Sequence, residues 1–84
     1  MSIENNNSVE HRKDIVEITI NEVQKEIHRG KRTVVEIKQA GNIPLNYALE
    51  QVIEGVLVPL DDSGSVVIKG GEIFVSHIKD GGSA

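Results

Sequence analysis

The fold is set by residues 15–41, which have the sequence IVEITINEVQKEIHRGKRTVVEIKQAG. Residues 15–20 are β-branched almost throughout. Residues 23–28 alternate apolar and polar side chains after the two-residue break Asn21-Glu22. Alternation puts successive side chains on opposite faces of a strand, and β-branched residues favour strands. The stretch therefore begins with a predicted β-hairpin.

A short helix is predicted after this hairpin and a loop at residues 29–32. Thr33 and Glu36 have the spacing of a capping box, in which each side chain accepts a hydrogen bond from the other residue's backbone N–H. The helix should span residues 34–40 and end at Gly41, in the left-handed conformation that glycine adopts easily. Two helical turns are unstable alone, so this helix must pack on a sheet.

The second half of the chain contains further predicted strands. They cover residues 48–53, 56–58 and 72–78, with a small apolar return at residues 66–68, and Pro59 should end the second of these strands. The order is strand, strand, helix, strand, strand, strand. This order predicts an α+β fold of the β-grasp type, with one short helix packed across a mixed sheet of four to five strands.

The last strand is predicted to turn Ile73 and Val75 toward the core. Phe74, Ser76 and Ile78 would then point outward and form a contact patch for a partner. Aliphatic side chains must dominate the core, because the chain has one Tyr, one Phe and no Trp. The expected core residues are Val16, Ile18, Ile20, Val23, Ile27, Val34, Ile37, Leu49, Val52, Leu57, Val67, Ile73 and Val75.

Length and composition restrict the function. With 84 residues the chain should form one small domain, and we expect a monomer. Thirteen acidic against nine basic residues give a net charge of −4, which argues against nucleic acid as a partner. There is no apolar run long enough for a membrane span and no recognisable secretory signal, so a cytoplasmic location is expected.

The two ends of the chain are predicted to be flexible. Residues 1–13 are polar, and residues 79–84 are glycine-rich without an apolar anchor. Residues 14–78 would form the folded domain. The Gly81-Gly82 pair is a candidate functional element, because a segment without side chains can enter a narrow enzyme channel and deliver a carboxylate to a reactive centre.

No catalytic or metal-binding residue is predicted, and we do not expect an enzyme. Ser76 and His77 are adjacent, but neighbouring strand residues point to opposite faces. The chain has no cysteine, and its three histidines lack the spacing of metal ligands. Residues 61–64 are expected to form a solvated acidic loop rather than a calcium site.

Residues 67–77 carry the most specific similarity to a known family. The segment Lys69-Gly70-Gly71-Glu72, followed by Phe-Val-Ser-His and then by Gly81-Gly82, resembles the ubiquitin-like β-grasp family, and within it the prokaryotic multiubiquitin-type domains. Weaker similarity covers residues 15–20, the hairpin, residues 33–37 and residues 49–55. The resemblance extends over residues 14–82.

The resemblance implies a protein modifier. An activating enzyme would use ATP to adenylate the carboxylate of Gly82, with Gly81 as its threading neighbour. The modifier would then pass as a thioester to a conjugating enzyme and be attached to lysines of target proteins. A peptidase must first cut between Gly82 and Ser83, removing Ser83-Ala84; a zinc-dependent isopeptidase is the expected partner for processing. No cofactor is implied for the chain itself. Such bacterial systems are similar to modules of anti-phage defence.

Two other functions remain open. Sulfur-carrier β-grasp proteins for cofactor biosynthesis share the fold, but they commonly end at Gly-Gly, and the extra Ser83-Ala84 favours the modifier. A non-covalent protein-binding module is the other alternative, with Phe74 and Ile78 as its contact residues.

Overall fold

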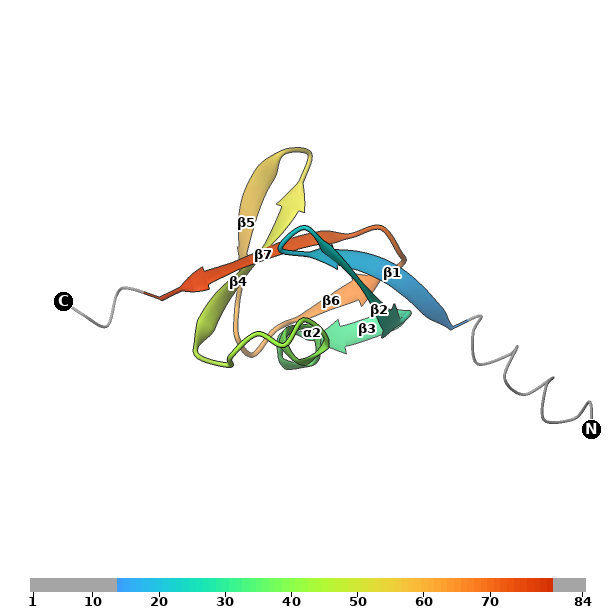
Figure 1. The fold of residues 1–84 in the computed structure, drawn as a ribbon, viewed down its shortest axis with the longest axis horizontal. Helices are drawn as coiled ribbons and strands as arrows, with labels where there is room; N and C mark the ends of the chain where they lie inside the picture. The colour runs from blue at the N-terminus through green and yellow to red at the C-terminus, as the bar shows by residue number, and fades with distance from the viewer. Residues whose placement is uncertain (1–13, 80–84) are drawn as a thin grey trace, which may run out of the picture.

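The computed structural model describes residues 14–79 (Figure 1). The predicted tail at residues 1–13 lies outside this range, as do Gly81, Gly82 and Ser83. The elements in chain order are β1 (Ile15–Ile20), β2 (Val23–His28), β3 (Gly30–Thr33), α2 (Val34–Ala40), β4 (Tyr47–Ile53), β5 (Val56–Leu60), β6 (Ser65–Ile68) and β7 (Ile73–Ile78).

Five strands form a mixed sheet in the order β2-β1-β7-β4-β5. The central pair β1–β7 is parallel, and the other neighbours are antiparallel. β3 and β6 form a separate antiparallel pair. Among the described residues, a mixed five-stranded sheet with one short helix is an α+β arrangement that is compatible with a β-grasp.

Two tight turns set the registers of the hairpins. Asn21 and Glu22 have φ angles of 52° and 71°, and Glu54 and Gly55 have φ angles of 52° and 80°. Positive φ at both central residues is typical of the type I′ turn, whose twist matches that of paired strands. The predicted hairpin at residues 15–28 is therefore confirmed.

The helix α2 has the bounds and the capping box that the sequence predicts. The Glu36 N–H donates to Thr33 Oγ1 at 3.1 Å, and the Thr33 N–H donates to Glu36 Oε1 at 2.8 Å. This hydrogen bond from the Thr33 backbone is the main reason that the pKa of Glu36 is lowered. The reciprocal bonds satisfy two backbone donors that a seven-residue helix could not satisfy internally.

The predicted left-handed cap at Gly41 is wrong. Gly41 has φ −95°, and the following Asn42 takes the positive φ of 57°. Glycine is required at position 41 for space instead. A Cβ atom there would lie 2.9 Å from Ile20 Cδ1 and Cγ2, closer than van der Waals contact allows. The helix end thus packs directly on β1.

Two strand predictions also need correction. The predicted loop at residues 29–32 is largely β3, which pairs with β6, a contact that no local signal in the sequence indicates. β5 continues through Pro59 to Leu60 rather than ending at Val58. β5 is the edge strand of the sheet, where a proline without an N–H costs no ladder hydrogen bond when that position faces outward.

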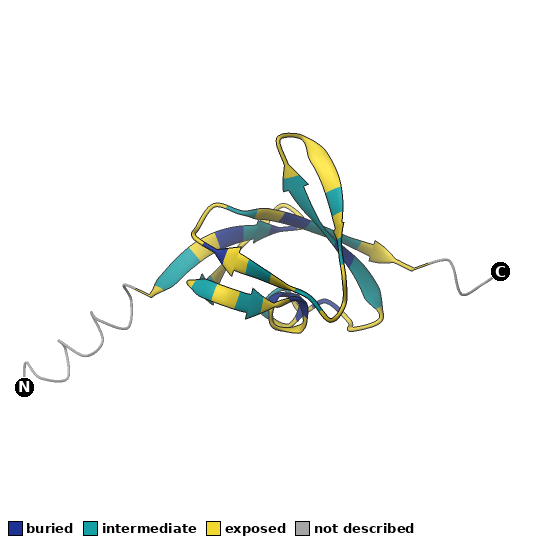
Figure 2. Ribbon diagram, turned by 180° about the vertical axis from the view of Figure 1, so that it is seen from behind, coloured by how far each residue is buried: buried dark blue, intermediate teal, exposed yellow. Residues whose placement is uncertain are grey.

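The core lies between the five-stranded sheet, α2 and the β3–β6 pair, where Figure 2 shows the buried segments. Five predicted core residues are buried, and Val16 and Ile27 pack partly against them. Val23, Leu57, Val67 and Ile73 are exposed instead. The buried hydrophobic residues are Ile18, Ile20, Val34, Ile37, Ile43, Leu49, Ile68 and Phe74.

The predicted orientation of β7 is inverted. Phe74 is 0% exposed, whereas Ile73 is 44% exposed. Phe74 pairs with the buried Ile20 across the parallel β1–β7 contact, so both side chains lie on the inner face. A shift of one residue in a strand exchanges its two faces. Because β7 has apolar residues on both faces, alternation alone does not identify the inner one.

Candidate protein-binding face

The outer face of the five-stranded sheet, opposite α2, carries a row of apolar side chains. Leu57 pairs with Val52 on β4, and Val52 pairs with Ile73 on β7. Side chains alternate between the two faces along a strand, so Val52 lies on the face opposite to the buried Leu49, and Ile73 on the face opposite to the buried Phe74. Leu57 is paired with Val52 and therefore also points away from the core. Leu57 is 53% exposed. Together with Val75 we call Val52, Leu57 and Ile73 the outer-face patch.

Charged groups border this patch. Glu50 pairs with Val75 in the sheet, and His77 pairs with Ala48, which places both polar side chains on the outer face. The His77 Nδ1 lies 3.5 Å from Glu50 Oε1, and Glu50 is the more buried of the two side chains. An apolar centre with a polar rim is the usual composition of a protein-binding surface.

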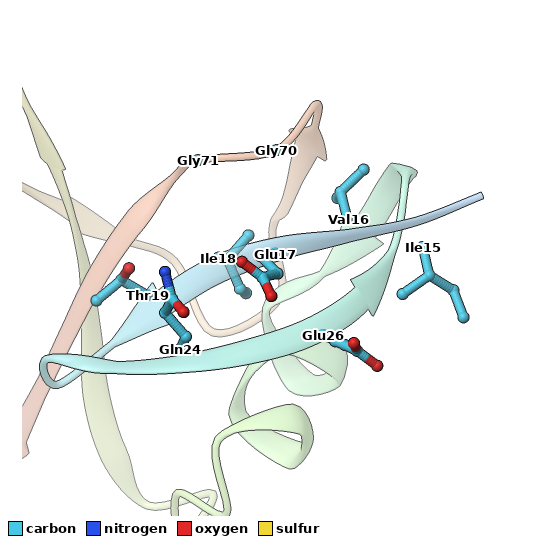
Figure 3. A pocket seen from close by; sticks show the side chains of 9 residues that line it. All are labelled: Ile15, Val16, Glu17, Ile18, Thr19, Gln24, Glu26, Gly70 and Gly71. Atoms are coloured by element: carbon cyan, nitrogen blue, oxygen red, sulfur yellow. The ribbon is translucent and has the colours of Figure 1, made fainter. Parts of the chain in front are cut away.

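An open depression of about 740 Å³ adjoins the patch (Figure 3). Glu17 on β1 lies directly opposite Glu26 on β2, and Thr19 lies opposite Gln24. Thr19 also pairs with Ile73, so the depression and the outer-face patch meet at that pair. Like charges directly opposite in a sheet are unfavourable, so a basic group of a partner would stabilise this end of the face.

The Gly70-Gly71 turn forms the rim of the depression. Both glycines have positive φ, 113° and 89°, which other residues rarely adopt. The Glu72 carboxylate accepts hydrogen bonds from the N–H groups of Lys69 and Gly70 at 2.8 and 2.9 Å. The Gly71 N–H donates to the carbonyl oxygen of Glu17 at 2.7 Å, which ties the turn to β1. Residues 69–72, which begin the segment that carries the family resemblance, thus form a structured turn.

The structure does not bring the predicted contact residues Phe74, Ser76 and Ile78 together on a surface. Phe74 belongs to the core, which corrects its assignment to a contact patch. Ser76 is tied to the first turn, because its N–H donates to Asn21 Oδ1 at 2.9 Å and its Oγ accepts from Asn21 Nδ2 at 2.8 Å. Ile78 is 66% exposed at the end of β7.

The outer-face patch escaped the sequence analysis because its members were assigned to the core. One signal could have found it. A single phenylalanine in an aliphatic chain is the side chain with most to gain from burial. Placing Phe74 inward turns Ile73 and Val75 outward, and the pairing of β7 with β4 then brings Val52 to the same surface.

Among residues 14–79, no group of three or more His, Cys, Asp or Glu side chains is placed to hold a metal ion. Within the same range, no helix is long and apolar enough to cross a membrane.

Comparisons with protein-family models, with curated proteins and with solved structures gave no match.

Proposed function

We propose that the chain is a bacterial ubiquitin-like protein modifier. In this proposal a peptidase cuts after Gly82, an activating enzyme adenylates the new carboxylate with ATP, and a conjugating enzyme transfers the chain to target lysines. The observation that supports the proposal is the strand order β2-β1-β7-β4-β5, with β1 and β7 parallel and one helix among residues 14–79. In the sequence, the central strand β7 is followed closely by Gly81-Gly82.

The distance between the domain and the proposed reactive group is short. Gly82 follows Lys79 by three residues, so the extended chain spans at most about 10 Å from Lys79. An enzyme that captures the Gly82 carboxylate must therefore also contact the domain near Ile78. Ile78, which is 66% exposed, supplies an apolar side chain for this contact.

The proposal divides the chemistry between the chain and its partners. The chain provides a carboxylate that becomes an electrophile after adenylation, and it has no cysteine. The nucleophilic thiols and the ATP site would belong to the activating and conjugating enzymes, and a zinc-dependent isopeptidase would release the modifier. A role in anti-phage defence and a cytoplasmic location are parts of the same proposal.

The direct test is thioester formation. A chain ending at Gly82 is incubated with ATP and with the activating enzyme that the proposal predicts to be encoded beside it. The expected product is an ATP-dependent adduct that a reducing thiol cleaves. The chain ending at Ala84 is the matched control and should form no adduct, because its carboxylate is two residues removed. If the shortened chain does not react, the modifier proposal is contradicted.

A second candidate function is non-covalent binding of a protein, which the outer-face patch favours. Under this alternative, Leu57→Asp and Ile73→Asp abolish function, whereas replacing Gly82 by a bulky residue leaves it intact. Under the modifier proposal, the Gly82 replacement abolishes function even when Leu57 and Ile73 are unchanged. A terminal thiocarboxylate on the chain, without lysine adducts, would instead indicate a sulfur carrier.

A further inference from the structure

The helix α2 buries a charged side chain that the sequence analysis did not single out. Lys38 is 1% exposed. Its Nζ donates to the carbonyl oxygens of Leu45 and Tyr47, at 2.9 and 2.6 Å, and to Asp62 Oδ1 at 3.1 Å. All three ammonium hydrogens therefore have acceptors, which is what burial of a lysine requires. The ammonium joins α2 to the start of β4 and to the loop before β6.

Asp62 makes a second contact through its other carboxylate oxygen. Its Oδ2 accepts a hydrogen bond from Lys79 Nζ, with which it also forms an ion pair. These two lysines, Lys79 first and then Lys38, lower the pKa of Asp62 by hydrogen bonding to its ionised form. One carboxylate therefore connects a buried ammonium to the residue that follows the last strand.

The two ends of this connection belong to the same corner of the sheet. Tyr47, whose carbonyl oxygen binds Lys38, is the strand partner of Ile78. Lys38 thus supports the end of β7 through β4, and it supports the next residue, Lys79, through Asp62. Lys79 is the last residue that the structure describes.

We propose that Asp62 is the anchor of the C-terminal exit. The bridge Lys38–Asp62–Lys79 holds Lys79, the last described residue, against the domain. Asp62 is a positioning residue, because it acts on Gly82 only through Lys79. The consequence for Gly82 rests on the proposed function, whereas the ordering of Lys79 does not depend on it.

Because Lys38 also binds Asp62, the Asp62–Lys79 contact is stronger than an ordinary ion pair at the surface. An exposed ion pair gains little, because two flexible side chains must both be ordered. Here Lys38 already fixes the Asp62 carboxylate, so pairing with Lys79 orders one side chain only. Asp61 provides a contrast in the same loop. Its Oδ1 accepts from the N–H and Oγ of Ser63, both at 3.2 Å.

The ordering is tested by ¹⁵N relaxation on the full chain. The heteronuclear NOE of the Lys79 amide should be close to that of Ile78 in the unchanged protein. It should fall in Asp62→Asn and in Lys79→Met, return in Lys79→Arg, and stay unchanged in Asp61→Asn, the matched control. Lys79→Met keeps the Lys38–Asp62 contact, so it tests the anchor even if Asp62→Asn unfolds the domain. An unchanged NOE in Lys79→Met overturns the proposal.

The consequence for function is tested separately with chains ending at Gly82. Loss of an exposed pair should raise the KM for the activating enzyme about two- to fivefold in Lys79→Met, with kcat unchanged. If the NOE falls in that variant but no chain forms a thioester, the anchor stands and the modifier proposal fails. If thioesters form with the same KM and the NOE is also unchanged, the anchor fails and the modifier proposal stands.

Discussion

Truncating two neighbouring residues of β7 separately tests which face of this strand points toward the core. Phe74→Ala removes a side chain that is 0% exposed, and Ile73→Ala truncates one that is 44% exposed. Truncating a buried Phe to Ala costs about 3–5 kcal/mol, because transfer energy is lost and a cavity remains. A buried Ile costs about 2–5 kcal/mol, so a side chain that is only half covered should cost roughly 1–2 kcal/mol.

These costs are large compared with the stability of the domain. At about 0.05–0.15 kcal/mol per residue, the described 66 residues correspond to a free energy of unfolding of about 3–10 kcal/mol. Phe74→Ala should therefore remove much of the stability and leave a measurable unfolded fraction without denaturant. Ile73→Ala should lower the Tm by about 4–16 °C and remain folded.

Urea unfolding followed by far-ultraviolet circular dichroism measures both variants. The m-value of Ile73→Ala should stay unchanged, which shows that only stability has altered. The reasoning would be refuted if Ile73→Ala cost as much free energy as Phe74→Ala or more. That result would mean that Ile73 faces the core and that the outer-face patch is not a surface.

Three further predictions concern the helix and its buried lysine. Gly41→Ala should destabilise the domain by about 1–3 kcal/mol through overpacking against Ile20, and an unchanged urea midpoint would contradict this. Thr33→Ala should cost about 1 kcal/mol by removing the helix cap, and no change in urea midpoint would count against the capping box. The folded-state pKa of Asp62 is lowered, so its contribution to stability is complete above the ordinary value of 3.8 and is lost as the pH falls through the lower folded pKa. In Asp62→Asn the free energy of unfolding should therefore fall less steeply at acid pH than in the unchanged protein, whereas Asp61→Asn should behave like the unchanged protein. The same pH dependence in both variants would contradict the bridge.

The sequence predicted correctly those features that depend on residues a few positions apart. The capping box needs only Thr33 and Glu36, and the first hairpin needs only alternation around Asn21-Glu22. Such signals hold because the interacting groups are a few residues apart. The helix bounds and the first hairpin were correct for this reason.

The errors concern features that depend on distant pairing. The pairing of β3 with β6 joins residues more than thirty positions apart, and four residues such as Gly30–Thr33 show no strand signal by themselves. The inward face of β7 is decided by its parallel contact with β1, so Phe74 and Ile73 were exchanged. The burial of Lys38 likewise depends on Asp62, which arrives from another loop.

One of these errors affected the candidate site. The exchanged faces of β7 hid the outer-face patch, since Ile73 and Val52 were counted as core residues. The predicted conjugation residue Gly82 and its neighbours Gly81 and Ser83 lie outside the described residues, and their role remains a prediction. The proposed conjugation site thus rests on the sequence alone, whereas the outer-face patch comes from the structure.

The most direct measurement of the modifier proposal is a search for the mark that conjugation leaves on targets. Trypsin cuts after Lys79, so a conjugated chain would leave Asp80-Gly81-Gly82 on the side-chain amine of a target lysine. Mass spectrometry of tryptic peptides from cells that make the protein should find this Asp-Gly-Gly remnant, and it should disappear when Gly82 is deleted. Recovery of the chain only with Ser83-Ala84 still attached, and of no lysine carrying the remnant, would contradict the account.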